Sequence, residues 1–324
     1  MKIAVCDDYQ DMVHRLPAFR LLAGHEVVRF REPAKDADAL VQRLRDVDII
    51  VAVRERVEFR RPLLERLPKL KLIALVGRNA TTIDFAACTA LGIPVSTGKS
   101  NSPDSPAELT VALIAASRRN IALEAHAMKR GDWPSTLSHR LRGSTLGVLG
   151  LGHIGSLVAQ SCHGMGMNIL VWGQEKSKAR ALELGYSVAA SKAELFERAD
   201  VLSLHARLRP ETRGIVGPDD LARMKPTALI VNTARAELIQ PGALVAALAR
   251  GRPGYAAVDV YEDEPIMQGD HPLLKMPNAL CVPHLGWAEW DNFELYFSEA
   301  FEQIVAYSSG TPMRLANPEV VAKR

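Results

Sequence analysis

The sequence predicts an α/β protein made of two doubly wound units, each built on a parallel β-sheet. Short apolar runs alternate with segments of helical periodicity from the start of the chain, as in KIAVCD (2–7), DADALVQRLRDV (36–47) and DIIVAV (48–53). Strands that alternate with helices form βαβ units, and such units build parallel sheets. The alternation pauses at GKSNSPDSP (98–106), which has the composition of a domain boundary, and restarts at TLGVLGLGHIG (145–155).

Helical segments flank the second unit on both sides. Residues 107–131 have helical periodicity throughout and are expected to form one long helical stretch after the boundary. Residues 294–310 predict a last helix, which Gly310 would cap. Between them lie five further strand candidates: NILVW (168–172), VLSLHA (201–206), ALIVNTA (228–234), YAAVDV (255–260) and ALCVP (279–283).

Composition is that of an ordinary globular protein of about two domains. The chain has 324 residues, of which 48% are hydrophobic and 24% charged, and its 40 basic and 37 acidic residues are mixed along the sequence. This mixing argues against a nucleic-acid partner, and no apolar run approaches the roughly 18 residues that cross a bilayer. Four widely spaced cysteines without a CxxC pair predict neither a metal site nor disulfides. We therefore expect a cytoplasmic protein with no metal and no membrane association.

A glycine loop follows the strand expected at 145–149. Gly150, Gly152 and Gly155 form the pattern G-x-G-x-x-G, and a helical run starts at once with His153 and Ile154. Glycines at these positions allow a tight turn and close approach of a pyrophosphate, which the helix N-terminus then binds. The strand–turn–helix context favours dinucleotide binding over a glycine loop that serves packing alone.

The end of the next strand leaves the choice of dinucleotide open. An acidic residue here would bind the ribose 2′-hydroxyl of NAD, but Gly173 and Gln174 occupy the position, and Glu175 comes late. Lys176 and further basic residues follow and could hold the 2′-phosphate of NADP. Both NAD and NADP remain candidates.

Three ionisable residues follow strands of the second unit. Arg235 comes after ALIVNTA, Glu264 after YAAVDV, and His284 after ALCVP. The carboxyl ends of parallel strands are where such sheets bind ligands. Arginine matches a substrate carboxylate, histidine donates a proton near neutral pH, and a neighbouring carboxylate favours the charged imidazole. Each alone is more typical of an ion pair, a structural histidine or an exposed turn; together, after a dinucleotide loop, they predict reduction of a keto acid.

The chain resembles the D-isomer-specific 2-hydroxyacid dehydrogenase family, which includes phosphoglycerate dehydrogenase and glyoxylate/hydroxypyruvate reductase. The resemblance covers nearly the whole chain. It is carried by an ordered series of segments: GLGHIG (150–155), SLHARLRPETRGIV (203–216), LARMKPTALIVNTARAEL (221–238), AAVDVYEDEP (256–265) and HPLLKMPNALCVPHLG (271–286).

The resemblance implies a role for each of the three ionisable residues. Arg235, in the motif N-x-x-R, would bind the carboxylate and carbonyl of the substrate. His284, in P-H-x-G, would be the general acid and base, and Glu264, rather than Glu262, would pair with it. The resemblance also implies cofactor contacts at residues near strand ends: His205, Ala206, Thr233 and Ala234. Asp259 would contact the nicotinamide amide.

The resemblance also implies the domain architecture. A Rossmann cofactor domain (103–290) would be inserted into a flavodoxin-like substrate domain (1–102 plus 291–324). A homodimer is implied, with residues 105–135, including Trp133, as an arm between subunits. The resemblance further implies that the segment LVGRNATTID (75–84) binds the substrate carboxylate, through backbone N–H groups around Gly77, Arg78 and Asn79. Arg54 would reach the same cleft.

The chain departs from the family pattern beside the proton donor. Trp287 and Glu289 stand where small residues and threonine are common, and Ala236 and Gln240 replace a usual Gly and Asp. A tryptophan there is expected to line and reshape the substrate pocket. A carboxylate at 289 is expected to disfavour highly anionic substrates such as phosphoglycerate. Glyoxylate or hydroxypyruvate is therefore the favoured type of substrate.

Other functions use the same or a similar fold. A corepressor-like protein that binds a dinucleotide without physiological turnover is the main alternative, and formate or phosphonate dehydrogenase chemistry is another. The acidic pair in IAVCDDYQ (3–10) is typical of a phosphorylated response regulator, but the later strand ends AVRER and LVGRN lack the Asp and Lys that such a site needs.

Overall fold

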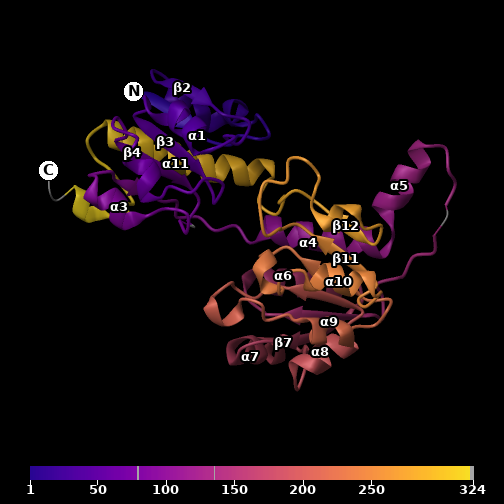
Figure 1. Cartoon of the computed structure of the whole chain (residues 1–324). Helices are drawn as coiled ribbons and strands as arrows, with labels where there is room; N and C mark the ends of the chain where they lie inside the picture. The colour runs from indigo at the N-terminus through magenta and orange to yellow at the C-terminus, as the bar shows by residue number, and fades with distance from the viewer. Residues whose placement is uncertain (79, 135, 322–324) are drawn as a thin grey trace. The chain divides into compact units, whose positions relative to one another are not determined.

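The computed structural model describes residues 1–78, 80–134 and 136–321, and these form two compact units (Figure 1). The N-terminal unit comprises Met1–Ser102 together with the C-terminal segment from Glu289, and the central unit comprises Pro103–Ala288. The chain leaves the central unit two residues before the expected boundary at 290/291. The reason is that the Glu289 carboxylate caps the last helix, accepting hydrogen bonds from the N–H groups of Asp291 and Asn292 at 2.8 Å each.

The N-terminal unit contains a five-stranded parallel sheet in the order β2-β1-β3-β4-β5. This is the flavodoxin-like order of a doubly wound sheet, so the predicted fold class of this unit is confirmed. Its strands are β1 (Lys2–Val5), β2 (Glu26–Arg29), β3 (Ile49–Val53), β4 (Leu72–Val76) and β5 (Val95–Ser96). Its helices are α1 (Ala37–Leu44), α2 (Arg61–Leu64), α3 (Phe85–Ala90) and α11 (Trp290–Ser308), with short 3-10 turns η1 (Val13–Arg15), η2 (Pro17–Leu22) and η6 (Pro318–Val320).

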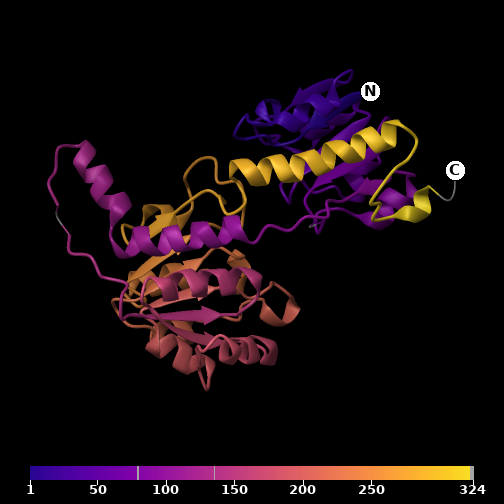
Figure 2. The same cartoon turned by 180° about the vertical axis from the view of Figure 1, so that it is seen from behind.

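The last helix, α11, belongs to the core of the N-terminal unit. It packs against β4 and η2, and Figure 2 shows its yellow ribbon lying along the indigo and purple elements of this unit. Phe297 and Phe301 are completely buried, and Phe301 meets Phe19 edge-on with ring centroids 6.2 Å apart. Burial of such aromatic side chains is a large part of what fixes a helix on a sheet.

The central unit contains a seven-stranded parallel sheet in the order β12-β11-β10-β9-β6-β7-β8. The order reverses at β6, as in a Rossmann fold. The strands are β6 (Thr145–Leu149), β7 (Asn168–Trp172), β8 (Ser187–Val188), β9 (Val201–Leu204), β10 (Leu229–Asn232), β11 (Tyr255–Val258) and β12 (Ala279–Cys281). The helices are α4 (Asp104–Arg118), α5 (Ile121–Lys129), α6 (His153–Gly164), α7 (Glu175–Glu183), α8 (Lys192–Arg198), α9 (Pro218–Arg223) and α10 (Ala243–Ala249), and η3 (Pro210–Thr212), η4 (Ala236–Leu238) and η5 (Pro272–Lys275) are 3-10 turns.

The helical stretch expected at 107–131 is two helices. Asn120 takes a left-handed conformation (φ 54°), which ends α4 and starts α5 in a new direction. α4 packs against α6 and the sheet, whereas α5 projects away from the rest of the central unit (Figure 1). Of the residues expected to form an arm (105–135), those of α4 therefore pack within the unit, and only those after α4 project from it. Exposed apolar side chains after α4 include Met128, Trp133 and Leu137, the last two at 79% and 95% exposure.

Within the described part of the chain, no helix combines the length and the apolar character needed to span a bilayer.

Candidate functional site

The three glycines of the loop after β6 have different surroundings: there is open space beside Gly152, whereas Gly150 and Gly155 are closely packed. A Cβ at Gly150 (φ +94°) would lie 3.0 Å from the Ala206 nitrogen, and one at Gly155 would lie 2.5 Å from the Gly150 carbonyl oxygen. At Gly152, which caps α6, a Cβ would meet nothing within 4 Å. The loop thus packs tightly underneath and is open above the N-terminus of α6, which is the arrangement that a pyrophosphate needs. His153 and Ile154 form the first turn of that helix.

Ser177, which the sequence analysis did not single out, connects this loop to the segment after the next strand. The Leu151 N–H donates to Ser177 Oγ over 3.1 Å. Ser177 also faces Gly173, where a Cβ would lie 3.2 Å from the serine Cβ and Oγ. A larger residue at 173 would therefore press on the serine that holds the glycine loop. The only sequence signal was a small hydroxyl residue in the first turn of the helix after β7.

The end of β7 presents more basic than acidic groups. Gln174 caps α7, and Lys176 in its first turn is exposed. Glu175 is largely exposed and pairs with Lys178 at 2.6 Å. Arg180 reaches back to α6, where its Nε donates to Ser156 Oγ at 2.8 Å. Among the basic residues, Lys176 is the first in the chain after the strand end where a ribose 2′ substituent is expected.

The ends of β9 and β10 carry the other residues predicted to contact the cofactor. His205 Nε2 lies 2.8 Å from Ser203 Oγ, and removal of the ring from water lowers the pKa of His205 to about 4. Thr233 Oγ1 lies 2.7 Å from Thr110 Oγ1, and because Thr110 donates to the Pro106 carbonyl, Thr233 is the donor between them. His205 is therefore neutral at physiological pH and contributes no positive charge to a phosphate site.

The turn after β10 explains the spacing N-x-x-R. Asn232 Nδ2 donates to the Arg235 carbonyl at 2.9 Å, and Asn232 Oδ1 accepts from the Ala234 N–H at 3.1 Å. The Arg235 guanidinium donates to the Ala234 carbonyl at 2.7 Å, and the residue caps η4. The buried amide of Asn232 thus shapes the short turn that presents Arg235 at the strand end.

His284 and Glu264 form a hydrogen-bonded pair. His284 Nδ1 lies 2.5 Å from Glu264 Oε2, and the other carboxylate oxygen accepts from the Tyr261 N–H at 2.9 Å. His284 has a left-handed backbone (φ 50°), which is rare for a non-glycine residue and is common at functional sites. The Glu264 carboxylate thus engages Nδ1 of the ring, and Nε2 is the nitrogen predicted to exchange a proton with a substrate.

Two residues of the same segment support the histidine loop. Asp259, completely buried at the end of β11, accepts from the N–H groups of Leu285 and Gly286 at 2.5 and 2.9 Å. Burial raises the pKa of Asp259 to about 6, against the lowering effect of these hydrogen bonds. Tyr261, which sequence reasoning did not single out, donates its hydroxyl to the Val282 carbonyl at 3.0 Å. Asp259 is therefore placed to fix the loop that carries His284, and its contact with a nicotinamide stays a prediction.

The sheet topology brings the three ionisable residues to one edge. Arg235, Glu264 and His284 follow β10, β11 and β12, which are neighbouring parallel strands. Their carboxyl ends therefore lie side by side at the edge where α/β sheets bind ligands.

The predicted substrate residues of the N-terminal unit cluster at the ends of β3 and β4. Arg54 has a left-handed backbone (φ 56°), its guanidinium carbon lies 5.9 Å from the centre of the Tyr296 ring, and Nη1 is 3.5 Å from where a Cβ of Gly77 would be. Gly77 (φ +95°) is buried and Arg78 is exposed. Asn79 lies outside the described residues.

The two residues that depart from the family pattern have different environments. Trp287 is only 6% exposed. The Glu289 carboxylate accepts two backbone hydrogen bonds as the cap of α11. The Glu289 carboxylate thus has a structural role at the helix terminus, and its expected effect on anionic substrates stays a prediction.

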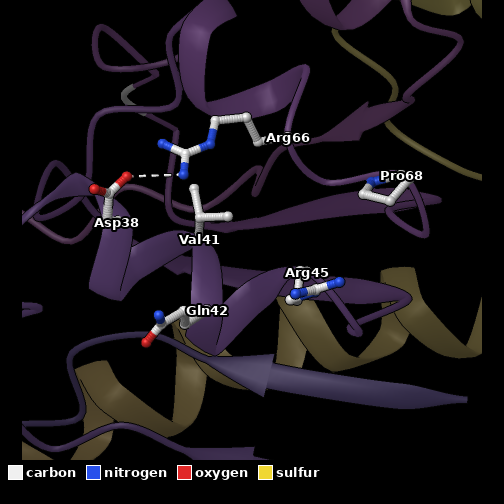
Figure 3. A pocket seen from close by; sticks show the side chains of 6 residues that line it. All are labelled: Asp38, Val41, Gln42, Arg45, Arg66 and Pro68. Carbon is white, nitrogen blue, oxygen red and sulfur yellow. Dashed lines mark hydrogen bonds and ion pairs between the residues drawn. The ribbon is translucent and has the colours of Figure 1, made fainter.

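The N-terminal unit also has a surface pocket beside α1, shown in Figure 3. An ion pair between Arg66 and Asp38, 2.8 Å long, crosses it. None of the predicted site residues lines this pocket. Its lining is mostly polar and consists of Asp38, Val41, Gln42, Arg45, Arg66 and Pro68.

Comparison with known proteins identifies the family. The family model of the D-isomer specific 2-hydroxyacid dehydrogenase NAD binding domain matches residues 111–286. A glyoxylate reductase of Aeropyrum pernix is 35% identical over 301 residues, which are 90% of this chain and 86% of that protein. A D-3-phosphoglycerate dehydrogenase of Methanocaldococcus jannaschii is 39% identical over 251 residues, 77% of this chain, and the match spans only 47% of that longer protein.

Solved structures agree over the whole chain. An oxidoreductase from Ralstonia solanacearum is 48% identical with a TM-score of 0.95, and the match covers 99% of this chain and 98% of that one. A phosphoglycerate oxidoreductase from Vibrio cholerae is 46% identical with a TM-score of 0.92, covering 96% and 99%. The chain therefore belongs to the D-isomer-specific 2-hydroxyacid dehydrogenase family, and it is an oxidoreductase of CH–OH groups with a nicotinamide dinucleotide cofactor.

Proposed function

We propose that the protein interconverts a small 2-keto acid and its D-2-hydroxy acid, with glyoxylate or hydroxypyruvate as the favoured substrate type. The observation that carries the proposal is the His284–Glu264 pair, which follows β12 and β11, the two strands next in order to β10, which presents Arg235. When bound at the glycine loop, the dinucleotide supplies the hydride. The protein's own residues bind and orient the substrate and supply the proton.

Arg235 binds the substrate carboxylate through its planar fork of donors, which fixes the direction of the carbonyl group. His284 Nε2 donates a proton to the carbonyl oxygen as negative charge develops there. Glu264 holds the ring through Nδ1 and favours its protonated form. In the opposite direction the same nitrogen accepts the hydroxyl proton.

In this proposal the N-terminal unit also carries groups that bind the substrate: backbone N–H groups around Gly77 and Arg78 and the Arg54 guanidinium bind carboxylate oxygens. In the central unit, Trp287 limits the size of the substrate side chain. A phosphorylated substrate is included in the test panel because phosphoglycerate dehydrogenases are among the relatives.

The test is oxidation of NADH and NADPH by the purified protein with a panel of substrates: glyoxylate, hydroxypyruvate, pyruvate and 3-phosphohydroxypyruvate. We expect turnover with at least one small 2-keto acid, and loss of orders of magnitude of that turnover in Arg235→Gln, because positioning alone supplies several kcal/mol of barrier lowering. Binding of the dinucleotide with no turnover on any 2-keto acid would contradict the proposal and favour the corepressor-like alternative.

For the cofactor, we propose that NADPH is accepted at least as well as NADH. The strand end carries Gly173 and Gln174 in place of an acid, and exposed Lys176 follows. A missing carboxylate removes repulsion of a 2′-phosphate, and a lysine attracts it. A value of kcat/KM tenfold or more higher with NADH would overturn this choice.

We further propose that the protein is a homodimer through the arm after α4. The arm exposes the apolar side chains of Met128, Trp133 and Leu137. Exposed apolar clusters of this kind are typical of protein interfaces. Light scattering should give twice the mass of the 324-residue chain, and Trp133→Ser with Leu137→Ser should shift it toward the monomer.

A further inference from the structure

A buried glutamate on α11 holds the segment that follows β5. Glu299 is 3% exposed, and both its carboxylate oxygens accept hydrogen bonds from this segment. Oε2 accepts from the N–H groups of Lys99 and Ser100 at 2.9 and 3.2 Å, and Oε1 accepts from Ser100 Oγ at 2.5 Å. Burial of a carboxyl group is destabilising unless hydrogen-bond donors surround its oxygens. The three donors provide that environment.

The held segment in turn contacts the predicted carboxylate loop. The Gly98 N–H, next to Lys99, donates to the Gly77 carbonyl at 2.8 Å. A Cβ at Gly98 would lie 2.7 Å from Glu299 Oε2 and 3.1 Å from the Gly77 carbonyl oxygen. Gly98 thus lies between the Glu299 carboxylate and the Gly77 carbonyl group, and a side chain at position 98 would not fit between them.

One turn earlier on α11, Tyr296 makes a parallel pair of contacts. Its hydroxyl oxygen accepts from the Ser102 N–H at 3.0 Å, and its ring lies beneath the Arg54 guanidinium. Tyr296 is also 3% exposed. Residues three apart on a helix lie on the same face, so a single face of α11 supports both the Gly77 loop and Arg54.

We propose that Glu299 and Tyr296 are positioning residues for substrate binding, which set the orientation of the Gly77 backbone and of the Arg54 guanidinium. The inference rests on the proposed function, because it assumes that the Gly77 loop binds the substrate carboxylate. Binding through backbone N–H groups depends on their orientation, and small misplacements of binding groups weaken it strongly.

The test compares three variants of the full-length protein: Glu299→Gln, Tyr296→Phe and, as the control, Glu302→Gln. Glu302 is on the same helix and loses the same charge, but its carboxylate is half exposed and pairs with Arg314 at 3.5 Å. For Glu299→Gln we expect KM for the 2-keto acid to rise by about tenfold, equivalent to about 1.4 kcal/mol. For Tyr296→Phe, which keeps the ring and loses one neutral hydrogen bond, we expect a rise of about threefold.

The KM for the dinucleotide should not change in any variant, and Glu302→Gln should match the wild type in both constants. A purely structural role of Glu299 would lower the thermal stability and change both KM values together, or change neither, and either result would overturn the proposal.

A second measurement does not depend on activity. Amide hydrogen exchange in peptides that cover Leu72–Ile83 should be faster in Glu299→Gln than in the wild type and Glu302→Gln. Unchanged exchange there would exclude the coupling between Glu299 and the Gly77 loop. If the wild type reduces no 2-keto acid, the proposed function fails, while the exchange measurement still decides whether α11 orders this loop.

Discussion

The carboxyl edges of the two sheets carry different chemistry. In the central unit, β10, β11 and β12 end in Arg235, the Glu264 carboxylate and the His284 imidazole, which are groups that bind charge and transfer protons. In the N-terminal unit, β3 and β4 end in Arg54 and the backbone of Gly77, which are groups that only bind an anion. In the proposed function, the central edge therefore orients the substrate through Arg235 and transfers the proton, whereas the N-terminal edge only contributes to binding of the substrate carboxylate.

Both edges use a buried carboxylate to hold the segment that carries the functional group. Asp259 accepts from the N–H groups of Leu285 and Gly286, directly after His284. Glu299 accepts from Lys99 and Ser100, directly after Gly98, which bonds to Gly77. The difference is their source: Asp259 follows a strand of the same sheet, whereas Glu299 comes from a helix about two hundred residues away in the chain. Variants at the two edges should therefore separate catalysis from substrate affinity.

The largest effect is expected from His284→Ala. Loss of a general acid lowers kcat by about a hundredfold to ten-thousandfold, while KM for the 2-keto acid should change little. Steady-state kinetics on the best substrate of the panel gives both constants. The matched control is His271→Gln, which breaks the neighbouring His271–Glu262 pair (3.1 Å) and should keep most of the activity. A His284→Ala variant with nearly full kcat would remove the proton-donor assignment and the contrast between the edges.

The next effect is a pH dependence of stability that Asp259 imposes. Burial raises its pKa from 3.8 to about 6 in the folded protein. Between these values the folded state holds a proton that the unfolded state has lost, so this group makes stability fall as pH rises through the window. At 1.36 kcal/mol per pH unit, the fall is up to about 3 kcal/mol and persists above pH 6. Asp259→Asn cannot titrate and should lack this fall.

Urea unfolding of the wild type and Asp259→Asn at several pH values measures the effect. The difference in free energy of unfolding, variant minus wild type, should increase as pH rises from about 4 to about 6. Parallel pH profiles would show that Asp259 has an ordinary pKa in the folded protein. In that case Asp259 would hold the His284 loop without the loss of stability that burial of its charged carboxylate is expected to cause.

The fold and the location of the site were predictable because both depend on local pattern. Alternating apolar runs and helices give parallel sheets, and parallel sheets bind ligands at their carboxyl ends. The glycine loop was predictable for the same reason, since one strand, one turn and one helix contain all of it. The pairing of Glu264 with His284 came from the family resemblance and not from spacing.

What the sequence did not reveal depends on contacts between distant or locally reoriented residues. Glu299 and Ser100 are 199 positions apart, and Ser177 meets Leu151 only because α7 packs beside the glycine loop. Glu289 stands five residues after His284, and the sequence did not show that its carboxylate caps α11. Glutamate is not among the preferred N-cap residues, so no local signal marked that role. The break at Asn120 was equally hidden within a continuous helical pattern.

Arg54→Gln sharpens the contrast from the other edge. Loss of a charged donor to the substrate carboxylate should raise KM for the 2-keto acid by about ten- to a hundredfold, with kcat and the dinucleotide KM nearly unchanged. Arg60→Gln is a control, since Arg60 follows the same strand and pairs on the surface with Glu58 at 3.2 Å. If Arg54→Gln instead lowers kcat as strongly as His284→Ala does, the two edges cannot be assigned separate tasks.

The smallest effect tests whether the dinucleotide loop is independent of both edges. Ser177→Ala leaves the Leu151 N–H without its acceptor, so the glycine loop loses its connection to α7. One neutral hydrogen bond is worth about 1 kcal/mol, so KM for the dinucleotide should rise about fivefold, and KM for the 2-keto acid should not. Ser161→Ala, on the exposed side of α6, is the control and should behave as the wild type. The contacts of Ser177 are with the glycine loop and Gly173. A rise in the 2-keto acid KM would therefore mean that the glycine loop and the substrate-binding groups are coupled, and dinucleotide binding and substrate binding could not be assigned to separate segments.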